Sequence, residues 1–130
     1  MKSLLKTVTA IGFIILAAAC DHTYQVEYEI RNISGTSITI SVDPLVDSVI
    51  TSTIANDTRL TFLDDFGIGS TTEDHLDGME SLFFELSILN GNGEAYNKDI
   101  RDISNWEKIY PEKNQSIGRV RLSVRPQDFD

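Results

Sequence analysis

The sequence predicts an all-β protein, folded as an antiparallel β-sandwich with an immunoglobulin-like or related Greek-key topology. Two observations predict this fold class. Short runs in which apolar and polar residues alternate recur along the chain and give about seven strands. Turn-forming residues separate these runs at intervals of roughly 8 to 12 residues, and no long amphipathic helix pattern accompanies them.

Four strands are expected in the first half of the domain. Residues 24–31 alternate strictly, with Tyr24, Val26, Tyr28 and Ile30 on one face, which is typical of a half-buried strand. The next strands are expected over residues 37–42, over a run with Val46, Ile50 and Ile54 on one face, and over residues 58–63.

A long acidic segment, residues 64–80, interrupts the strands. It contains six carboxylates and no lysine or arginine. Unstructured segments of this length are uncommon in compact domains and are usually functional or mobile. Because like charges repel one another, we expect this segment to be a mobile loop.

Further strands and one helical turn are expected after the acidic segment. The most apolar strand covers residues 81–89 and buries Leu82, Phe84, Leu86 and Ile88. The run Asn90-Gly91-Asn92-Gly93 is a strong hairpin signal. The remaining elements are a short strand over residues 94–98, one helical turn near residues 104–110 with capping-box spacing between Ser104 and Glu107, and a last strand over residues 118–125.

The N-terminus has the layout of a secretory signal. Lys2 and Lys6 precede an uncharged, mostly apolar segment over residues 7–19, which is shorter than the roughly 20 residues that a spanning helix needs. The segment ends in Leu16-Ala17-Ala18-Ala19-Cys20, and Cys20 is the only cysteine of the chain.

The site around Cys20 resembles the lipobox of bacterial lipoproteins, with Ala17 in place of the usual leucine and Leu16 one position earlier. The resemblance implies that the chain is cut before Cys20, that the thiol takes a diacylglycerol, and that the new amine is acylated. Two or three acyl chains anchor a protein far more firmly than one. The implied organisation is a lipoprotein signal peptide at residues 1–19, a lipidated tether at residues 20–23 and a single β-sandwich domain at residues 24–130.

The chain as a whole resembles small Bacteroidota β-sandwich lipoproteins of uncharacterised function. The resemblance rests on a loose lipobox followed directly by a β-sandwich, and on the segments 102–106 and 125–129. It implies a protein of the cell envelope that is lipid-anchored to a membrane. The outer membrane is favoured, with the domain in the periplasm or at the cell surface.

The charge of the chain counts against a nucleic-acid partner. The chain has 11 basic and 20 acidic side chains, and loss of Lys2 and Lys6 with the signal leaves nine basic against 20 acidic groups, a net charge of −11. Such a surface repels nucleic acid. Because Cys20 is the only cysteine, no intrachain disulfide can form and the core must stabilise the fold.

No catalytic site, metal site or cofactor is predicted. The only histidines are His22, in the tether, and His75, in the acidic segment, and no Gly-x-Ser-x-Gly motif accompanies them. No histidine or cysteine pair has the spacing of zinc ligands. Calcium would suit the acidic segment, and residues 90–94 faintly resemble a calcium loop, but the order of ligands is missing.

Trp106 and Tyr110 are the candidate contacts with a ligand or partner. They lie four residues apart in the expected helical turn, so they would share a face that could stack on a sugar ring or anchor a protein. The alternative is that Trp106 closes the end of the core. A stripe of arginines on the last strand is expected to pair with acids of the first strand across the sheet: Arg119, Arg121 and Arg125 with Glu27 and Glu29.

The predicted function is a non-enzymatic binding or accessory module, held at a membrane by its lipid and contacting a protein or glycan partner. Two alternatives stay open: a carbohydrate-associated surface module that uses exposed aromatic residues, and a small hydrolase or inhibitor that uses residues 64–80. Exposure of Trp106 would favour the first alternative. A concave pocket that holds His75 with ordered acids would favour the second.

Overall fold

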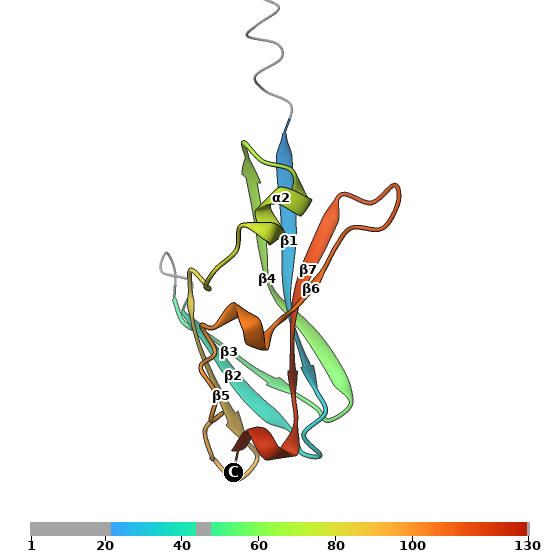
Figure 1. Ribbon diagram of the computed structural model, residues 1–130. Helices are drawn as coiled ribbons and strands as arrows, with labels where there is room; N and C mark the ends of the chain where they lie inside the picture. Colours follow the sequence, from blue (N-terminus) through green and yellow to red (C-terminus); the bar gives the residue numbers. More distant parts are fainter. Residues whose placement is uncertain (1–21, 44–47, 130) are drawn as a thin grey trace, which may run out of the picture.

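The computed structural model describes residues 22–43 and 48–129. These residues form seven strands in two sheets, four strands in one sheet and three in the other (Figure 1). The predicted all-β sandwich is confirmed, and both sheets and their shared core lie within the described residues. Cys20, the predicted signal peptide and Val46 of the predicted third strand lie outside them.

The four-stranded sheet has the strand order β4-β1-β7-β6. Its neighbouring strands are antiparallel except β1 and β7, which run in the same direction over eight paired residues. The sheet is therefore mixed rather than antiparallel throughout. The sequence did not predict the parallel pair, because alternation indicates the face of each side chain but not the direction of the neighbouring strand. Its strands are β1 (Thr23–Asn32), β4 (Thr58–Ile68), β6 (Glu107–Ile109) and β7 (Ile117–Val124).

The three-stranded sheet has the order β3-β2-β5 and is antiparallel. The strand predicted over residues 94–98 is wrong, since only Ala95 pairs there, in an isolated bridge with Leu89. After this bridge the chain turns toward the C-terminal segment, where Asn97 N donates a hydrogen bond to Asp128 O at 2.8 Å. The strands of this sheet are β2 (Ile38–Asp43), β3 (Ile50–Ile54) and β5 (Glu85–Asn90).

Aromatic rings occupy the centre of the core. The Phe84 ring packs edge-on against Tyr28, with centroids 5.1 Å apart, and against Phe62, with centroids 5.6 Å apart. Such edge-to-face pairs add stability beyond the area that they bury. The predicted inward faces of three strands are confirmed as buried: Val26, Tyr28 and Ile30 in β1, Ile38, Ile40 and Val42 in β2, and Val120, Leu122 and Val124 in β7.

The acidic segment is structured, contrary to the prediction of a mobile loop. β4 continues through its first two acids to Ile68, paired with the start of β1, and helix α2 (Thr72–Asp77) follows. Thr71 caps this helix, since its side chain accepts a hydrogen bond from Asp74 N at 3.2 Å. Glu73 and Asp74 lie in the first turn, where the helix dipole favours negative charge.

The helical turn expected near residues 104–110 is present but shorter. It is the 3₁₀ segment η1 (Ile103–Asn105), which is capped by Asp102 rather than by Ser104. The residues that follow form β6 because they pair with the free edge of β7. A second 3₁₀ segment, η2 (Pro126–Phe129), follows β7.

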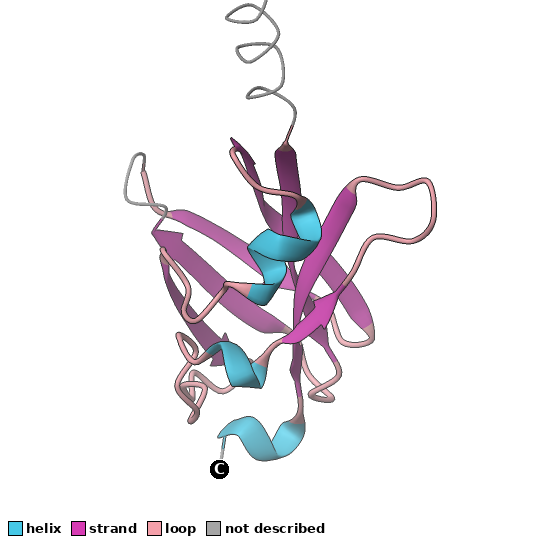
Figure 2. Cartoon of the chain, turned by 45° about the horizontal axis from the view of Figure 1, so that its top comes forward, coloured by secondary structure: helices cyan, strands magenta, loops and turns pink. Residues whose placement is uncertain are grey.

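The helical segments lie in one column in Figure 2, with α2 near the start of β1, η1 below it and η2 beyond the end of β7. No helix within the described ranges is both long and apolar enough to cross a bilayer. Helix α2, at the upper end of this column, forms one wall of a cleft that contains His75.

Candidate functional site

Two residues of α2 fasten it to the four-stranded sheet. Thr72 Oγ1 accepts a hydrogen bond from Gln25 N at 3.2 Å and donates one to Ser116 O at 2.8 Å. Leu76 is fully buried. A Cβ on Gly118 of β7 would lie 2.8 Å from Leu76 Cδ1, so the glycine allows α2 to pack directly on the strand.

A β-bulge determines which side of β4 faces α2. The register of β4 against β1 shifts by one residue at Phe62. Beyond the shift, Asp65 and Gly67 face the helix, whereas Phe66 and Ile68 are exposed. Without the extra residue these faces would be exchanged, so the bulge directs the Asp65 carboxylate toward α2.

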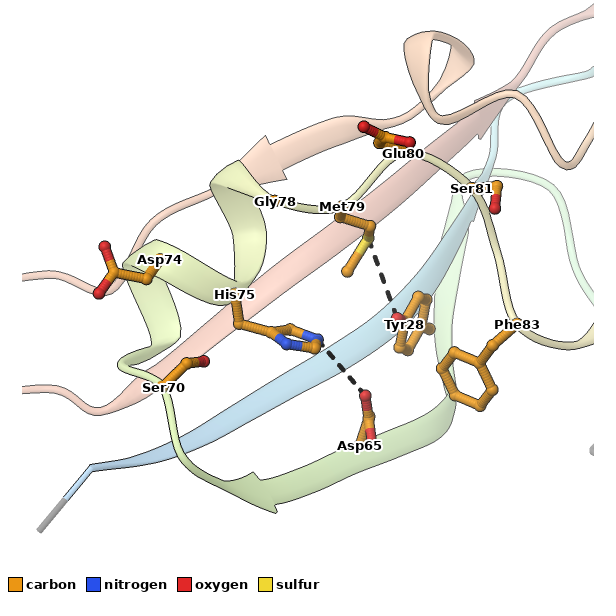
Figure 3. A pocket seen from close by; sticks show the side chains of 10 residues that line it. All are labelled: Tyr28, Asp65, Ser70, Asp74, His75, Gly78, Met79, Glu80, Ser81 and Phe83. Atoms are coloured by element: carbon orange, nitrogen blue, oxygen red, sulfur yellow. Dashed lines mark hydrogen bonds and ion pairs between the residues drawn. The ribbon is translucent and has the colours of Figure 1, made fainter. Parts of the chain in front are cut away.

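A cleft of about 420 Å³, the His75 cleft, opens between α2, the end of β4 and the segment after the helix. In Figure 3 the side chains of His75, Met79 and Asp65 point toward Tyr28, and the Phe83 ring closes one side. The site therefore combines a histidine–carboxylate pair, a phenol and an apolar wall.

One carboxylate enters the His75 cleft. Figure 3 shows the side chains of Asp74 and Glu80 pointing away from the central space, which leaves Asp65 as the acceptor inside it. Of the described residues that line the cleft, none is a lysine or arginine. A ligand with hydrogen-bond donors can therefore reach the Asp65 carboxylate, which it would share with His75.

His75 is held from two sides. Its Nε2 lies 3.6 Å from Asp65 Oδ2, and its ring stacks on that of Tyr24 with centroids 3.7 Å apart and planes 7° apart. A Cβ on Gly67 would lie 2.5 Å from Tyr24 Cζ. The glycine on β4 therefore makes room for the ring that orients His75. Burial, and the nearby Asp65 carboxylate, raise the pKa of Tyr24.

Tyr28 has a poorly satisfied hydroxyl at the floor of the cleft. Its side chain is buried, and the hydroxyl donates to Met79 Sδ at 3.9 Å. A thioether sulfur is a weak acceptor, and the described residues offer this hydroxyl no other hydrogen bond. Burial, and then the Asp65 carboxylate, raise the pKa of Tyr28 far above its ordinary value. The hydroxyl is therefore a neutral donor that an oxygen of a ligand could engage more strongly.

Replacing Tyr28 with phenylalanine is expected to reduce the loss of stability at alkaline pH. The unfolded chain releases this proton near pH 10, while the folded chain still holds it, so the free energy of unfolding falls as the pH rises above about 10. Urea titrations at about pH 9 and about pH 11 measure the difference. Tyr96, whose pKa burial raises to about 12, contributes equally in both proteins. An equal loss of stability in wild type and Tyr28→Phe would contradict the expectation.

The cleft contains a possible base but no serine aligned with it. Ser70 and Ser81 line the cleft, and Ser70 Oγ donates to Thr71 O at 3.1 Å. A serine nucleophile is activated through a hydrogen bond to its base, and neither serine makes such a bond to His75 within the described residues.

The described ranges contain no group of three or more His, Cys, Asp or Glu side chains arranged to hold a metal ion. In the turn that faintly resembles a calcium loop, Asn90 Oδ1 accepts hydrogen bonds from the amides of Asn92 and Glu94. Asn90 Nδ2 donates to the Glu94 carboxylate. These contacts engage Asn90 Oδ1 and one oxygen of the Glu94 carboxylate within the turn itself.

The predicted aromatic contacts are separated from each other. Trp106 is 5% exposed, and its Nε1 donates to Ile100 O at 2.8 Å, so it closes the core as the alternative interpretation held. Tyr110 is exposed and donates to Asp77 Oδ1, which raises the pKa of Tyr110. The shared helical face is absent because residues 107–109 are extended as β6. Neither residue lines the His75 cleft.

Two of the three expected arginine pairs are confirmed. Arg119 Nε lies 2.8 Å from a Glu27 oxygen and Arg121 Nε 2.5 Å from a Glu29 oxygen. These pairs form because β1 and β7 are neighbours in matching register. Arg125 lies beyond the end of β7 and forms no ion pair with the residues described.

Sequence patterns single out His75 but not the residues that it faces. The alternation of β1 assigns Tyr28 to the core, and composition assigns Asp65 to a loop. One signal in the sequence could have shown that the strand continues past Asp65. Phe66 and Ile68 are apolar and two residues apart, with Gly67 between them, which is the period of a strand.

No protein-family model matches this chain. Comparison with curated proteins and with solved structures also finds no significant match. A function is therefore inferred from the fold and from the His75 cleft.

Proposed function

We propose that this chain is a non-enzymatic binding module of the cell envelope, held at a membrane by a lipid on Cys20. The run Leu16-Ala17-Ala18-Ala19-Cys20 supports the anchor. We expect the outer membrane, with the domain in the periplasm or at the cell surface. The observation that carries the binding role is the buried Tyr28 hydroxyl, which faces the His75 cleft with only a thioether as partner.

The chemistry of the cleft fits a hydroxyl-rich ring, such as a sugar residue of a glycan. A hydroxyl can donate to Asp65 and accept from Tyr28 within the same site. Phe83 is 46% exposed and packs edge-on against Tyr28 with centroids 5.8 Å apart. Its free face can contact the C–H surface of a sugar ring, as aromatic side chains do in mostly apolar pockets with few polar groups.

Oligosaccharide binding should depend on the cleft. In calorimetric titrations with a panel of neutral oligosaccharides, we expect at least one to bind, and Asp65→Asn and Phe83→Ala each to weaken it by about tenfold or more. Leu89→Ala is the matched control, because Leu89 is 41% exposed and lies in β5, outside the cleft. Absence of binding across the panel, or an equal effect of Leu89→Ala, would refute the sugar assignment.

Replacing Cys20 with alanine is expected to release the protein from membranes or to leave its precursor uncut, because the thiol is the atom that would carry diacylglycerol. Membrane fractionation and mass spectrometry of the mature protein measure both results. His22→Ala is the control, and it should remain in the membrane fraction. An unmodified Cys20 in the mature wild type would rule out the anchor without affecting the argument for the cleft.

A small hydrolase is the second candidate, favoured by the His75–Asp65 pair inside a concave cleft. It would require Ser70 or Ser81 to turn toward His75 when substrate binds. A fluorophosphonate probe tests this requirement. Labelling that disappears in Ser70→Ala or Ser81→Ala would support the hydrolase against the non-enzymatic proposal.

A further inference from the structure

Three arginines meet on the outer face of the four-stranded sheet. Arg31 of β1, Arg59 of β4 and Arg121 of β7 line a cleft of about 380 Å³ together with Asp57 and Thr58. We call it the arginine cleft. It shares no residue with the His75 cleft, and the strand alternation puts the two on opposite faces of the sheet.

Arg31 and Arg59 lie directly opposite each other in the β1–β4 pair. Like charges in this position destabilise a sheet. Neither guanidinium has an ion pair or hydrogen bond with the residues described, although the chain has 20 acidic and only 11 basic side chains. Both guanidiniums therefore keep their hydrogen-bond donors available for an anionic ligand.

Arg121 adds a third guanidinium in a fixed position. Its Nε contacts the buried Glu29 carboxylate at 2.5 Å, and its Nη1 lies 3.7 Å from exposed Glu107. A guanidinium has five N–H donors, so Arg121 retains donors for a further acceptor. Glu29 thus orients Arg121 at the cleft.

Asp57 is the acid that lines the arginine cleft. Its carboxylate accepts a hydrogen bond from Asn56 Nδ2 at 2.9 Å. It therefore has a neutral partner in its own turn. Because Arg121 is already paired with Glu29 and Glu107, the two guanidiniums without an ion pair, those of Arg31 and Arg59, face one carboxylate in the cleft. The local charge favours an anion despite the acidity of the whole chain.

We propose that the arginine cleft binds the phosphate group of a soluble ligand. Guanidinium groups bind phosphate with paired hydrogen bonds, and two neighbouring arginines on one face of a sheet can both donate to one tetrahedral group. Arg31 is eight residues beyond Thr23, which is about 26 Å along the strand. If Cys20 is anchored, as proposed above, the cleft lies away from that membrane, so a soluble phosphate ester fits better than a lipid headgroup.

The first test uses inorganic phosphate and the chain from residue 20 onward, which contains both sheets and the core. Phosphate is titrated against chloride at constant ionic strength and followed by ¹⁵N nuclear magnetic resonance. We expect saturable shifts at the amides of Arg31, Thr58, Arg59 and Arg121, with a dissociation constant of about 1 mM. Shifts identical to those with chloride would overturn the proposal.

The second test compares variants with the same change of charge. Arg59→Gln should weaken phosphate binding by about tenfold or more, whereas Arg101→Gln, in an exposed segment outside the cleft, should not. In chloride alone, Arg59→Gln should melt no lower than the wild type, because it removes a like-charge pair. If both variants weaken phosphate binding equally, the effect comes from the net charge of the protein rather than from the cleft, and the proposal is overturned.

The third test separates the two sources of phosphate. Glucose 6-phosphate is titrated into the same chain, and vesicles with phosphatidic acid are offered in parallel. Binding of the sugar phosphate with loss in Arg59→Gln supports the soluble source. Arg59-dependent binding to the vesicles without binding of the sugar phosphate would overturn it. Neither result depends on whether Cys20 is lipidated, because this chain is not acylated.

Discussion

Replacing Phe84 with alanine is expected to lower the free energy of unfolding by about 3 to 5 kcal/mol. The Phe84 ring is 1% exposed and contacts three other rings edge-on, those of Tyr28, Phe62 and Phe83. The cost combines lost burial of the ring with the cavity left among these neighbours. Equilibrium urea unfolding of the domain measures it.

The neighbouring residue provides the control. Phe83 is chemically identical but half-exposed, so Phe83→Ala should cost less than about 1.5 kcal/mol. The comparison tests the face assignment of this segment directly. Similar losses in the two variants, or a loss near zero for Phe84→Ala, would contradict the assignment.

Replacing Arg121 with methionine is expected to lower the free energy of unfolding by about 3 kcal/mol or more, because it leaves the Glu29 carboxylate buried without its charged partner. The Glu29 side chain is 5% exposed and the Arg121 side chain 17% exposed. Methionine retains most of the aliphatic bulk, so the measured loss reports mainly on the charge. Urea unfolding near neutral pH is the appropriate measurement.

Arg119→Met is the matched control two residues away on the same strand. The Arg119–Glu27 pair has similar geometry, but the Arg119 side chain is 44% exposed, and exposed pairs contribute about 0 to 1 kcal/mol. We therefore expect the two variants to differ clearly. If Arg121→Met and Arg119→Met lower the free energy of unfolding equally, burial of Glu29 has no energetic role.

Most strands of the sandwich were predictable from sequence because alternation reports burial directly, but β6 was not predicted, and the strand expected over residues 94–98 is absent. The inward faces of β1, β2 and β7 were correct, although Glu29, on the outward face of β1, is also buried. Alternation reports only on the strand that carries it, so it did not show that β7 runs parallel to β1.

The candidate site was less predictable, because its geometry depends on a one-residue insertion. The bulge at Phe62 reverses the faces of β4 and turns Asp65 toward His75. Nothing in a single sequence marks such a shift. The acids of residues 64–80 suggested a mobile loop by their charge, but capping by Thr71 and burial of Leu76 outweigh that repulsion.

The segment with Trp106 shows a second reason why the sequence did not predict the local structure. Trp106 and Tyr110 have helical spacing, but they lie next to an open edge of β7, and pairing with that edge extends residues 107–109. Local capping signals compete here with a tertiary hydrogen-bond ladder, and the ladder determines the conformation.

The parallel pairing of β1 and β7 has a mechanical consequence for a chain fixed at its N-terminal end. Tension between Cys20 and the end of β7 would pull the two strands past each other along their length. All eight paired positions would then share the load and would have to break together, instead of separating one after another from an end. Resistance to such a force depends on the unfolding rate. We therefore expect this domain to withstand stretching along the direction in which a membrane anchor would hold it.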